Sequence, residues 1–303
     1  GERDDQIPEC QEQICVRRRA NPGSVLDLNT THGYRYDMER ELTSAAKSAG
    51  EIKPVVVVSQ CLGFAAVRYN GAMLQDDFVQ ALGRHVQFAQ VCPEVAIGLG
   101  VPRDPIRIIE RRGERSLVQP STGRDLSEPM RQFAETFLDN VGPVDGFILK
   151  NRSPSCGIKD VKIFAAAEQA PAVGKSAGFF AAAVLRRCSH AAIEDEGRLT
   201  NSRLRHHFLT RVFANARLRE ARRQREPAAL VWFHTEYKLQ LMAYSQTGLT
   251  SLGRIVANRD GLSLERVLAA YAERLAQVMA HPARPASMRN ALQHAFGYVS
   301  DSL

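Results

Sequence analysis

Residues 144–157 read Val-Asp-Gly-Phe-Ile-Leu-Lys-Asn-Arg-Ser-Pro-Ser-Cys-Gly. The apolar run at 144–149 is typical of a buried strand, and Pro154 and Gly157 favour a turn directly after it. The stretch therefore predicts a strand that ends on a loop, where Cys156 lies among polar side chains. Because Gly157 has no side chain, we expect it to let a ligand approach the backbone there.

Two earlier stretches repeat this plan. The valine run at 55–58 leads into Cys61, and the apolar run at 86–91 leads into Cys92. Each stretch predicts a strand that delivers one thiol at its carboxyl end. In open α/β sheets, ligands bind beyond the carboxyl ends of the strands. Three such cysteines therefore indicate one shared site.

The alternation of strands and helices defines the fold class. Helical patterns at 76–83 and 126–141 lie between the apolar runs, and a third at 178–187 follows them. This alternation predicts an α/β fold with a mainly parallel, Rossmann-like sheet and a smaller all-α domain after it. Beyond residue 200 the periodicity is helical, with helices expected over 230–244, 247–258, 263–281 and 285–299. We expect four segments: a poorly ordered extension over 1–51, the α/β domain over 52–197, an arginine-rich helical linker over 198–226 and the helical domain over 227–303.

Composition narrows the class of protein. The 303 residues are 44% hydrophobic and 24% charged, as in globular proteins, and no apolar run approaches the ~20 residues that a membrane helix needs. The first residues have no signal-peptide character, so we expect a cytoplasmic location. Six cysteines in such a chain argue against a disulfide framework and favour metal binding or catalysis.

The residues alone leave several uses of the three cysteines open. Cys61, Cys92 and Cys156 lie too far apart in sequence for a compact C-x-x-C metal motif. Three interpretations remain: inert buried thiols, ligands of a zinc ion with an open position, or ligands of an iron–sulfur cluster with one open iron. A cysteine nucleophile would need a histidine base, and the nearest in sequence is His85.

Cations near the cysteines suggest thiolate character. Lys150, Arg152 and Arg68 stand close to them in sequence, and neighbouring positive charge lowers the pKa of a thiol. We therefore expect the three thiols to be readily deprotonated and competent as ligands.

A second charge feature lies at residues 198–225, which contain nine arginines and a single acidic residue, Glu220. Arginine suits bidentate contacts with phosphate and stacking on bases, so the segment favours a nucleic-acid contact. A solvated helix face is the other interpretation. The net charge of +7 agrees with both.

Three ordered motifs carry a resemblance to a known family. They are Ser59-Gln60-Cys61-Leu62-Gly63 with Arg68-Tyr69-Asn70-Gly71, then Val91-Cys92-Pro93-Glu94, then the stretch 149–157. With these motifs, residues 52–187 resemble the thiouracil desulfidase family. The helical remainder, especially 232–239 and 292–298, resembles a second uncharacterised domain often fused to the first, as in proteins that remove sulfur from 4-thiouridine in tRNA.

The resemblance implies a [4Fe-4S] cluster held by Cys61, Cys92 and Cys156, whose open fourth iron takes the sulfur of the substrate. It implies a non-redox hydrolysis that converts 4-thiouridine in tRNA to uridine and releases hydrosulfide. Two alternatives stay open: desulfidation of free thiouracil or thiouridine, and a non-catalytic RNA-binding iron–sulfur protein.

Roles for the polar residues follow from the same motifs. Glu94 is the expected catalytic acid/base, or else a structural partner of Arg103. Ser153 and Ser155 are expected to orient water or the base, or else to cap the turn. Relatives often carry acidic residues where this chain has Ala65, Gln87 and Ala96. We expect substrate contacts from Lys150, Arg68, Tyr69 and Asn70, and RNA contacts from Arg217, Arg219, Arg222, Arg223 and Lys238.

Overall fold

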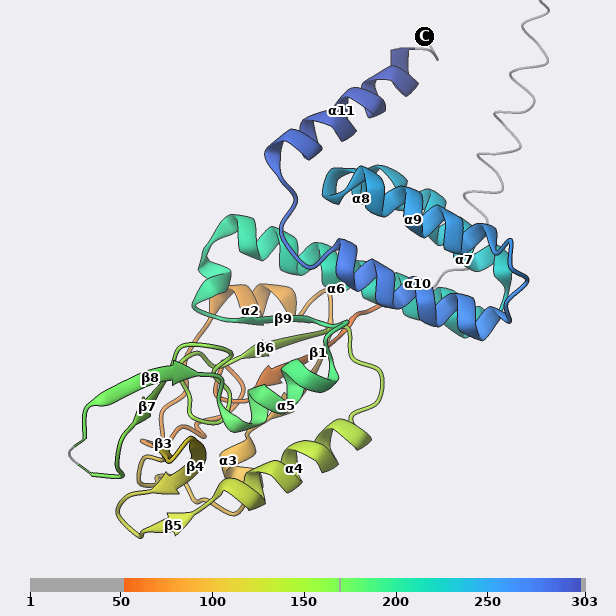
Figure 1. Cartoon of the computed structure of the whole chain (residues 1–303). Helices are drawn as coiled ribbons and strands as arrows, with labels where there is room; N and C mark the ends of the chain where they lie inside the picture. Colours follow the sequence, from red (N-terminus) through yellow and green to blue (C-terminus); the bar gives the residue numbers. More distant parts are fainter. Residues whose placement is uncertain (1–51, 169, 301–303) are drawn as a thin grey trace, which may run out of the picture. The chain divides into compact units, whose positions relative to one another are not determined.

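The computed structural model describes residues 52–168 and 170–300, and the segment 1–51, for which we expect poor order, lies outside this range. Residues 52–303 form one unit that contains two sheets and a set of helices (Figure 1). No helix in the part that the structure describes is both long and apolar enough to span a membrane.

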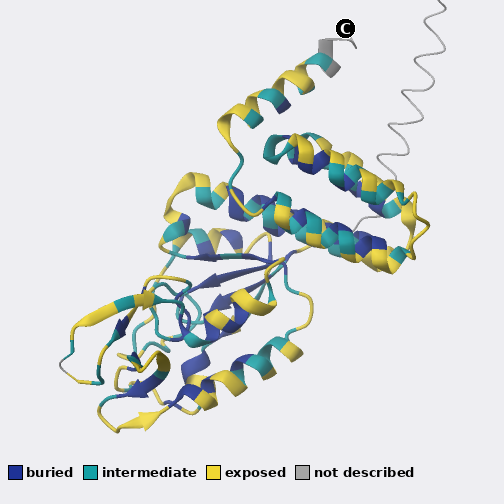
Figure 2. Cartoon of the chain, in the orientation of Figure 1, coloured by how far each residue is buried: buried dark blue, intermediate teal, exposed yellow. Residues whose placement is uncertain are grey.

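The first sheet confirms the expected α/β class. Its four strands are all parallel, in the order β2 (Gln87–Val91), β1 (Val55–Ser59), β6 (Gly146–Leu149) and β9 (Ala192–Asp195). Strands β1 and β6 are buried almost throughout, as Figure 2 shows, because helices cover this sheet. The carboxyl ends of β1, β2 and β6 meet at one edge, so the three cysteines that follow them come to the same edge.

A second sheet was not expected. Its order is β5 (Arg124–Asp125), β4 (Glu114–Gln119), β3 (Arg107–Arg111), β7 (Val161–Phe164) and β8 (Ala172–Ser176). Only the β3–β7 pair is parallel, so this sheet is mixed. The apolar run at 161–164 forms β7 of this sheet. Strand β8 has no buried residue and no apolar alternation, which is why the pattern did not reveal it.

Four helices complete the α/β part: α2 (Asp77–Leu82), α3 (Pro93–Ala96), α4 (Ser127–Asn140) and α5 (Phe179–Arg187). Asp76 caps α2 by accepting a hydrogen bond from the Val79 N–H at 2.9 Å. Asp125 accepts from the Ser127 N–H at the start of α4. Helices α4 and α5 lie side by side and pack Met130 and Phe180 against Phe147 of the first sheet (Figure 1).

Six helices follow: α6 (Ser202–Gln224), α7 (Pro227–Glu236), α8 (Lys238–Tyr244), α9 (Gln246–Ala257), α10 (Leu264–Val278) and α11 (Pro285–Ser300). The single helix expected over 230–244 is two helices that meet at Tyr237. Helix α6, in the segment expected as a linker, contributes to two cores. Phe208 and Val212 pack with the first sheet, whereas Leu218 and Ala221 pack with the later helices.

Asp145 fastens α6 to the first sheet. Its buried carboxylate accepts hydrogen bonds from the Val55 N–H at 2.8 Å and from the Arg219 guanidinium at 2.8 Å. Its carbonyl oxygen accepts from the Asn215 side chain. Arg219, which we expected to bind RNA, is therefore engaged inside the protein, and reversing its charge would disturb the fold as well as any RNA contact.

Burial of His207 makes stability depend on pH. On α6, His207 Nδ1 lies 2.8 Å from the Tyr244 hydroxyl of α8. Burial, followed by the nearby charges of Arg211, His281, His206 and Arg203, lowers the pKa of His207 to about 4. The unfolded chain takes up this proton near pH 6.5 but the folded chain only near pH 4. We therefore expect the free energy of unfolding to fall between these values, by at most about 1.4 kcal/mol per pH unit.

Urea unfolding of His207→Gln and wild type across this pH range measures the effect. The wild type should lose more stability than the variant between pH 6.5 and 4. His206→Gln, at an exposed position on the same helix, is the matched control and should behave like wild type. Equal pH dependence in wild type and His207→Gln would contradict the assignment.

Candidate metal centre and active site

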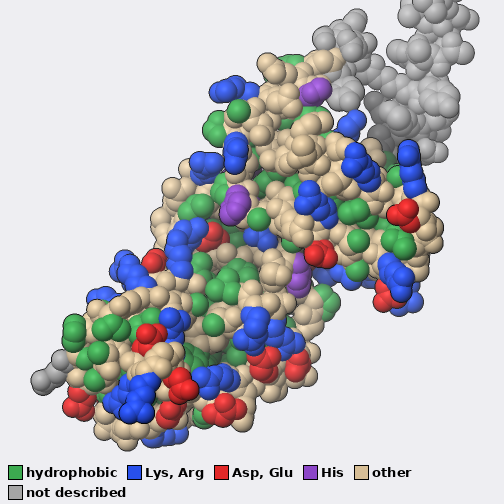
Figure 3. Space-filling view, viewed as in Figure 1, with side chains coloured by type: hydrophobic (Ala, Val, Ile, Leu, Met, Phe, Trp, Pro, Cys, Tyr) green, Lys and Arg blue, Asp and Glu red, His purple; other side chains and the backbone are tan. Residues whose placement is uncertain are grey.

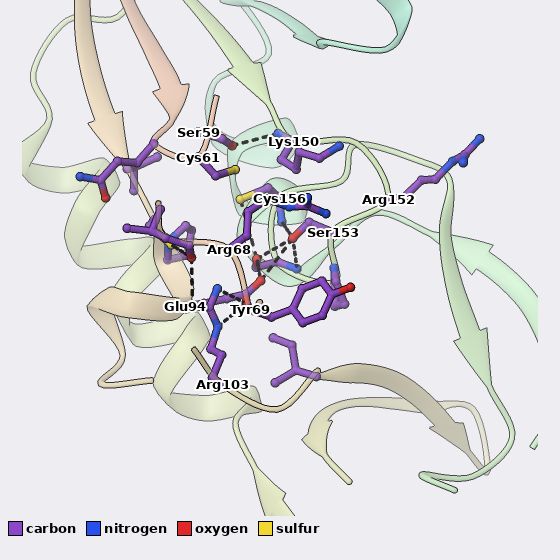
Figure 4. A pocket seen from close by; sticks show the side chains of 18 of the residues that line it. Ser59, Cys61, Arg68, Tyr69, Glu94, Arg103, Lys150, Arg152, Ser153 and Cys156 are labelled. Carbon is purple, nitrogen blue, oxygen red and sulfur yellow. Dashed lines mark hydrogen bonds and ion pairs between the residues drawn. The ribbon is translucent and has the colours of Figure 1, made fainter. Parts of the chain in front are cut away.

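A cavity of about 500 Å³ lies where β1, β2 and β6 end (Figure 4). All three predicted cysteine ligands line it. So do six of the seven residues expected to act in catalysis or substrate binding: Glu94, Ser153, Ser155, Lys150, Arg68 and Tyr69. The seventh, Asn70, is not part of the lining, and its side chain accepts a hydrogen bond from the Ala72 N–H within its own turn.

The three thiols converge from different elements. Cys61 follows β1, Cys92 lies between β2 and α3, and Cys156 lies in the turn after β6. In Figure 4 the sulfur atoms of Cys61 and Cys156 point toward one another. Cys61 lies close enough to both Cys92 and Cys156 for a negative charge on one sulfur to disfavour a charge on the other. The topology of the first sheet therefore produces the shared site that the strand ends predicted.

Burial controls the protonation of these thiols. It raises the pKa of Cys61 to about 11 and that of Cys156 to about 12, and it also raises the pKa of Cys92. The Lys150 ammonium opposes this at Cys61, but it is outweighed. The expectation that nearby cations keep the thiols deprotonated is therefore wrong for the protein without a metal. Binding a metal here must displace protons from sulfur.

Glu94 is held in one orientation by three side chains. Arg103 donates to Glu94 Oε2 through Nε at 2.9 Å and Nη2 at 2.7 Å. Ser155 donates to Oε1 at 2.7 Å, and the Ser153 hydroxyl lies 3.3 Å from the same atom. The Glu94 and Arg103 side chains are only 12% and 6% exposed. The pairing with Arg103 is thus present, and it leaves Oε1 directed at the two serines.

Ser153 combines two contacts. Its hydroxyl accepts from the backbone N–H groups of Ser155 and Cys156 at 3.3 and 3.2 Å, so it caps the turn that carries Cys156. The same hydroxyl lies 2.9 Å from the Ser155 hydroxyl and within reach of Glu94. Glu94 and the two serines therefore form one hydrogen-bonded group beside the cysteines.

Gly157 serves chain packing. A Cβ at this position would lie 2.5 Å from Val161 Cγ2 and 2.9 Å from the Ser153 carbonyl oxygen. Gly157 does not line the cavity. The expectation that it admits a ligand is therefore wrong: the glycine lets the turn close against β7.

Lys150 is held by a residue that sequence reasoning missed. Its ammonium pairs with the Glu196 carboxylate, and both side chains are mostly buried. The second oxygen of Glu196 accepts from the Asn151 N–H at 2.8 Å. Glu196 follows β9, the fourth parallel strand. The stretch 192–196 ends on three acidic residues, and treating it as a further strand end would have placed Glu196 at this edge.

An aromatic ring and two arginines, Arg68 and Arg152, lie among the residues that line the cavity. The Arg68 guanidinium carbon lies 5.8 Å from the centre of the Tyr69 ring, and Tyr69 is 44% exposed. Arg152 has a left-handed backbone (φ 55°), and its side chain extends away from the labelled cavity residues in Figure 4.

The residues expected to contact RNA lie on other elements. Arg217, Arg219, Arg222 and Arg223 are on α6 and Lys238 begins α8, and none of them lines the cysteine cavity. Arg223 pairs with Glu220 at 2.7 Å. On the face that Figure 3 shows, Lys and Arg side chains are spread over the molecule and partly interleaved with Asp and Glu. This face does not show one continuous basic patch.

The side chains of the cavity decide which metal group it can hold. The cavity offers three thiols and no histidine. Within 52–168 and 170–300, no group of three or more Cys, His, Asp or Glu is arranged to hold a single metal ion. A zinc ion needs all its sulfur ligands within ~2.3 Å of one atom, whereas the thiolates of an iron–sulfur cluster bind different irons. The residues present therefore fit a cluster better than mononuclear zinc.

Comparisons with known proteins agree with a two-part chain. A family model described as 2-thiouracil desulfurase matches residues 56–196, and a model described as a protein of unknown function (DUF1722) matches residues 238–303. The first match begins in β1 and ends at Glu196, and it includes all three cysteines.

Individual relatives each match a part of the chain. The chain is 32% identical over 110 residues to the uncharacterized protein YbbK of Bacillus subtilis (strain 168), covering 34% of this chain and 73% of YbbK. It is 35% identical over 95 residues to the uncharacterized protein YbgA of Escherichia coli (strain K12), covering 30% of this chain and only 54% of YbgA. Among solved structures, the [4Fe-4S]-dependent thiouracil desulfidase TudS is 31% identical, with 49% of this chain and 94% of TudS covered and a TM-score of 0.38.

Proposed function

The chain belongs to the 2-thiouracil desulfurase family, and from this premise we propose that it removes sulfur from a thiolated pyrimidine with an iron–sulfur cluster held by Cys61, Cys92 and Cys156. One observation carries the proposal. Three thiols from three strand ends line the same cavity as a carboxylate that is hydrogen-bonded to two serine hydroxyls.

We propose further that the natural substrate is 4-thiouridine in tRNA. The support is the arginine-rich α6, together with the exposed Tyr69 and the half-buried Arg68 that line the cavity. An aromatic ring beside a guanidinium suits a base that leaves its stack. The alternative is desulfidation of free thiouracil or thiouridine.

The reaction is a hydrolysis without electron transfer. When bound, the cluster would supply a Lewis-acidic iron for the sulfur of the substrate. A water oxygen forms a bond to the ring carbon, the carbon–sulfur bond breaks, and sulfur leaves as hydrosulfide. Glu94 Oε1 takes a proton from the attacking water, and the Ser153 and Ser155 hydroxyls orient that water. Arg103 keeps the carboxylate directed at the serines.

Lys150 has a separate electrostatic role in this proposal. Its ammonium lies close enough to Cys61 to favour the thiolate there. It would offset part of the negative charge that three thiolates bring into a mostly buried site. Glu196 limits this effect, because it pairs with the same ammonium.

Anaerobic reconstitution followed by a substrate comparison tests the function. The full-length protein, loaded with iron and sulfide, is mixed with 4-thiouracil, 4-thiouridine and tRNA that contains 4-thiouridine. We expect loss of the thiocarbonyl absorbance with release of one hydrosulfide per thio-group, fastest with tRNA. Turnover of the free base alone would leave the family activity and remove the tRNA proposal. No loss with any of the three would refute a desulfidase and favour a non-catalytic iron–sulfur protein.

A further inference from the structure

A second cavity adjoins the cysteine cavity. It measures about 580 Å³, and it shares Pro105, Ile106, Arg152 and Pro154 with the lining of the first. Its other charged lining residues are Arg107, Lys162, Lys175 and Asp160. We call Arg107, Arg152, Lys162 and Lys175 together the basic groove. Four cations and one carboxylate thus line a space that adjoins the cysteine cavity.

The second sheet places three of these cations in one row. Lys162 on β7 lies directly opposite Lys175 on β8 in the antiparallel pair. The parallel register of β3 and β7 pairs Ile108 with Ile163, which sets Arg107 beside Lys162. Buried Ile108 and Ile163 face the core, so the row lies on the other face of the sheet, where both lysines are exposed.

Repulsion within this row of cations destabilises the sheet when no anion is bound. Like charges directly opposite each other across an antiparallel pair are destabilising. The neighbouring Asp160 relieves the repulsion only in part, since its carboxylate lies 3.6 Å from the Lys175 ammonium and both side chains are at least half exposed. The arrangement is explained if an anion occupies the space between the cations.

The remaining groups suit a nucleotide. The Arg107 guanidinium carbon lies 5.0 Å from the centre of the Phe164 ring, which lines the same cavity, and Arg107 also donates to the Ala167 carbonyl oxygen at 3.2 Å. These contacts hold the guanidinium over the groove while leaving donors for a phosphate oxygen.

We propose that the basic groove binds the phosphate of a nucleotide whose thio-base enters the cysteine cavity. This deepens the proposed function and rests on it. The shared wall at Ile106 and Pro154 separates base from phosphate, and Arg152 stands between the two spaces. Phosphate recognition then resides in the α/β part itself, on a surface that the arginines of α6 do not form.

The test compares two double variants of the full-length protein. Lys162→Gln/Lys175→Gln removes two charges from the groove. Arg111→Gln/Arg124→Gln removes two charges elsewhere on the same sheet, from exposed positions at the end of β3 and on the opposite edge strand β5. Circular dichroism and urea unfolding verify that both variants fold. Binding of a labelled single-stranded RNA with one 4-thiouridine is measured by fluorescence anisotropy against salt.

We expect the groove variant to bind this RNA roughly tenfold more weakly, with a salt slope lower by about 1.4, since each phosphate contact on a single strand contributes about 0.7. Turnover of free 4-thiouracil should stay at the wild-type rate. The control variant should match wild type. Equal losses in both variants, or unchanged RNA binding in the groove variant, would overturn the proposal.

A small substrate identifies which phosphate is bound. A higher KM for 4-thiouridine 5′-monophosphate in the groove variant assigns the groove to the phosphate of the target nucleotide. An effect on RNA alone assigns the groove to neighbouring phosphodiesters and overturns the assignment to the target nucleotide. Anisotropy needs no turnover, so groove-dependent binding without desulfidation by wild type would refute the proposed function and keep the groove. If the wild type removes sulfur but the groove variant shows unaltered RNA binding and KM, the proposed function stands and the groove is refuted.

Discussion

Cys156→Ala is expected to yield a folded protein that retains no iron–sulfur cluster and removes sulfur only at the background rate. Cys156 is the most enclosed of the three thiols, at 5% exposure, and it enters the cavity from the turn after β6. An alanine leaves two thiol ligands in a cavity without a histidine to replace the third. Loss of one buried sulfur costs on the order of 1 kcal/mol of stability, which the fold should tolerate.

Iron and sulfide analysis after anaerobic reconstitution measures this effect, together with the visible absorbance of the cluster. Cys188→Ala is the matched control, because Cys188 ends α5, is partly buried and lies outside the cavity. The control should bind iron and sulfide as wild type does. A wild-type content of both in Cys156→Ala would remove Cys156 from the ligand set.

Glu94→Gln is expected to lower kcat by about 10²–10⁴-fold while the iron content stays unchanged. The amide keeps the shape of the carboxylate but cannot accept a proton from water at Oε1. Ser155 and Ser153 would then face a group of different hydrogen-bonding character. The loss should appear in kcat more than in KM, because the proton is transferred only in the chemical step.

Glu94→Gln also breaks the ion pair with Arg103, and a second substitution separates the effect on stability from the effect on activity. Glu94→Gln leaves the Arg103 guanidinium buried without its carboxylate, and such a loss destabilises by several kcal/mol. Glu94→Gln/Arg103→Gln removes the unpaired charge, so we expect stability to recover while activity does not. Glu110→Gln, in a surface pair with Arg115, is the control for losing an ion pair. Recovery of activity in the double variant would make Glu94 structural.

The part of the fold that the sequence predicted is the part with strong periodicity. Valine-rich β1 and the apolar β6 are buried on both faces, so their runs are unbroken and their type was clear. Their thiols come together because parallel strands share one edge, and this required no contact information. The hairpin β3–β4 also has a local signal, since a turn at Arg112 and Gly113 separates its two strands.

The features that the sequence did not predict depend on contacts between residues far apart in the chain. The second sheet joins β3 to β7 over a long sequence separation, and its edge strand β8 has no apolar pattern. The prediction of deprotonated thiols was wrong because burial, which only the fold determines, outweighs the cations that are adjacent in sequence. Glu196 was missed because β9 was not recognised as a fourth strand whose end reaches Lys150.

Helix α6 couples the folding of the two parts of this chain that match different sequence families. One end of α6 completes the core beneath β1 and β6, and the other end completes the core of the later helices. Melting either core therefore removes packing surface from the other, and unfolding of the α/β and helical parts is cooperative. The match to the first family stops at Glu196, before this helix, so a fragment cut there would expose Val56 and Ile148 to water. The unit of folding is longer than the unit of homology.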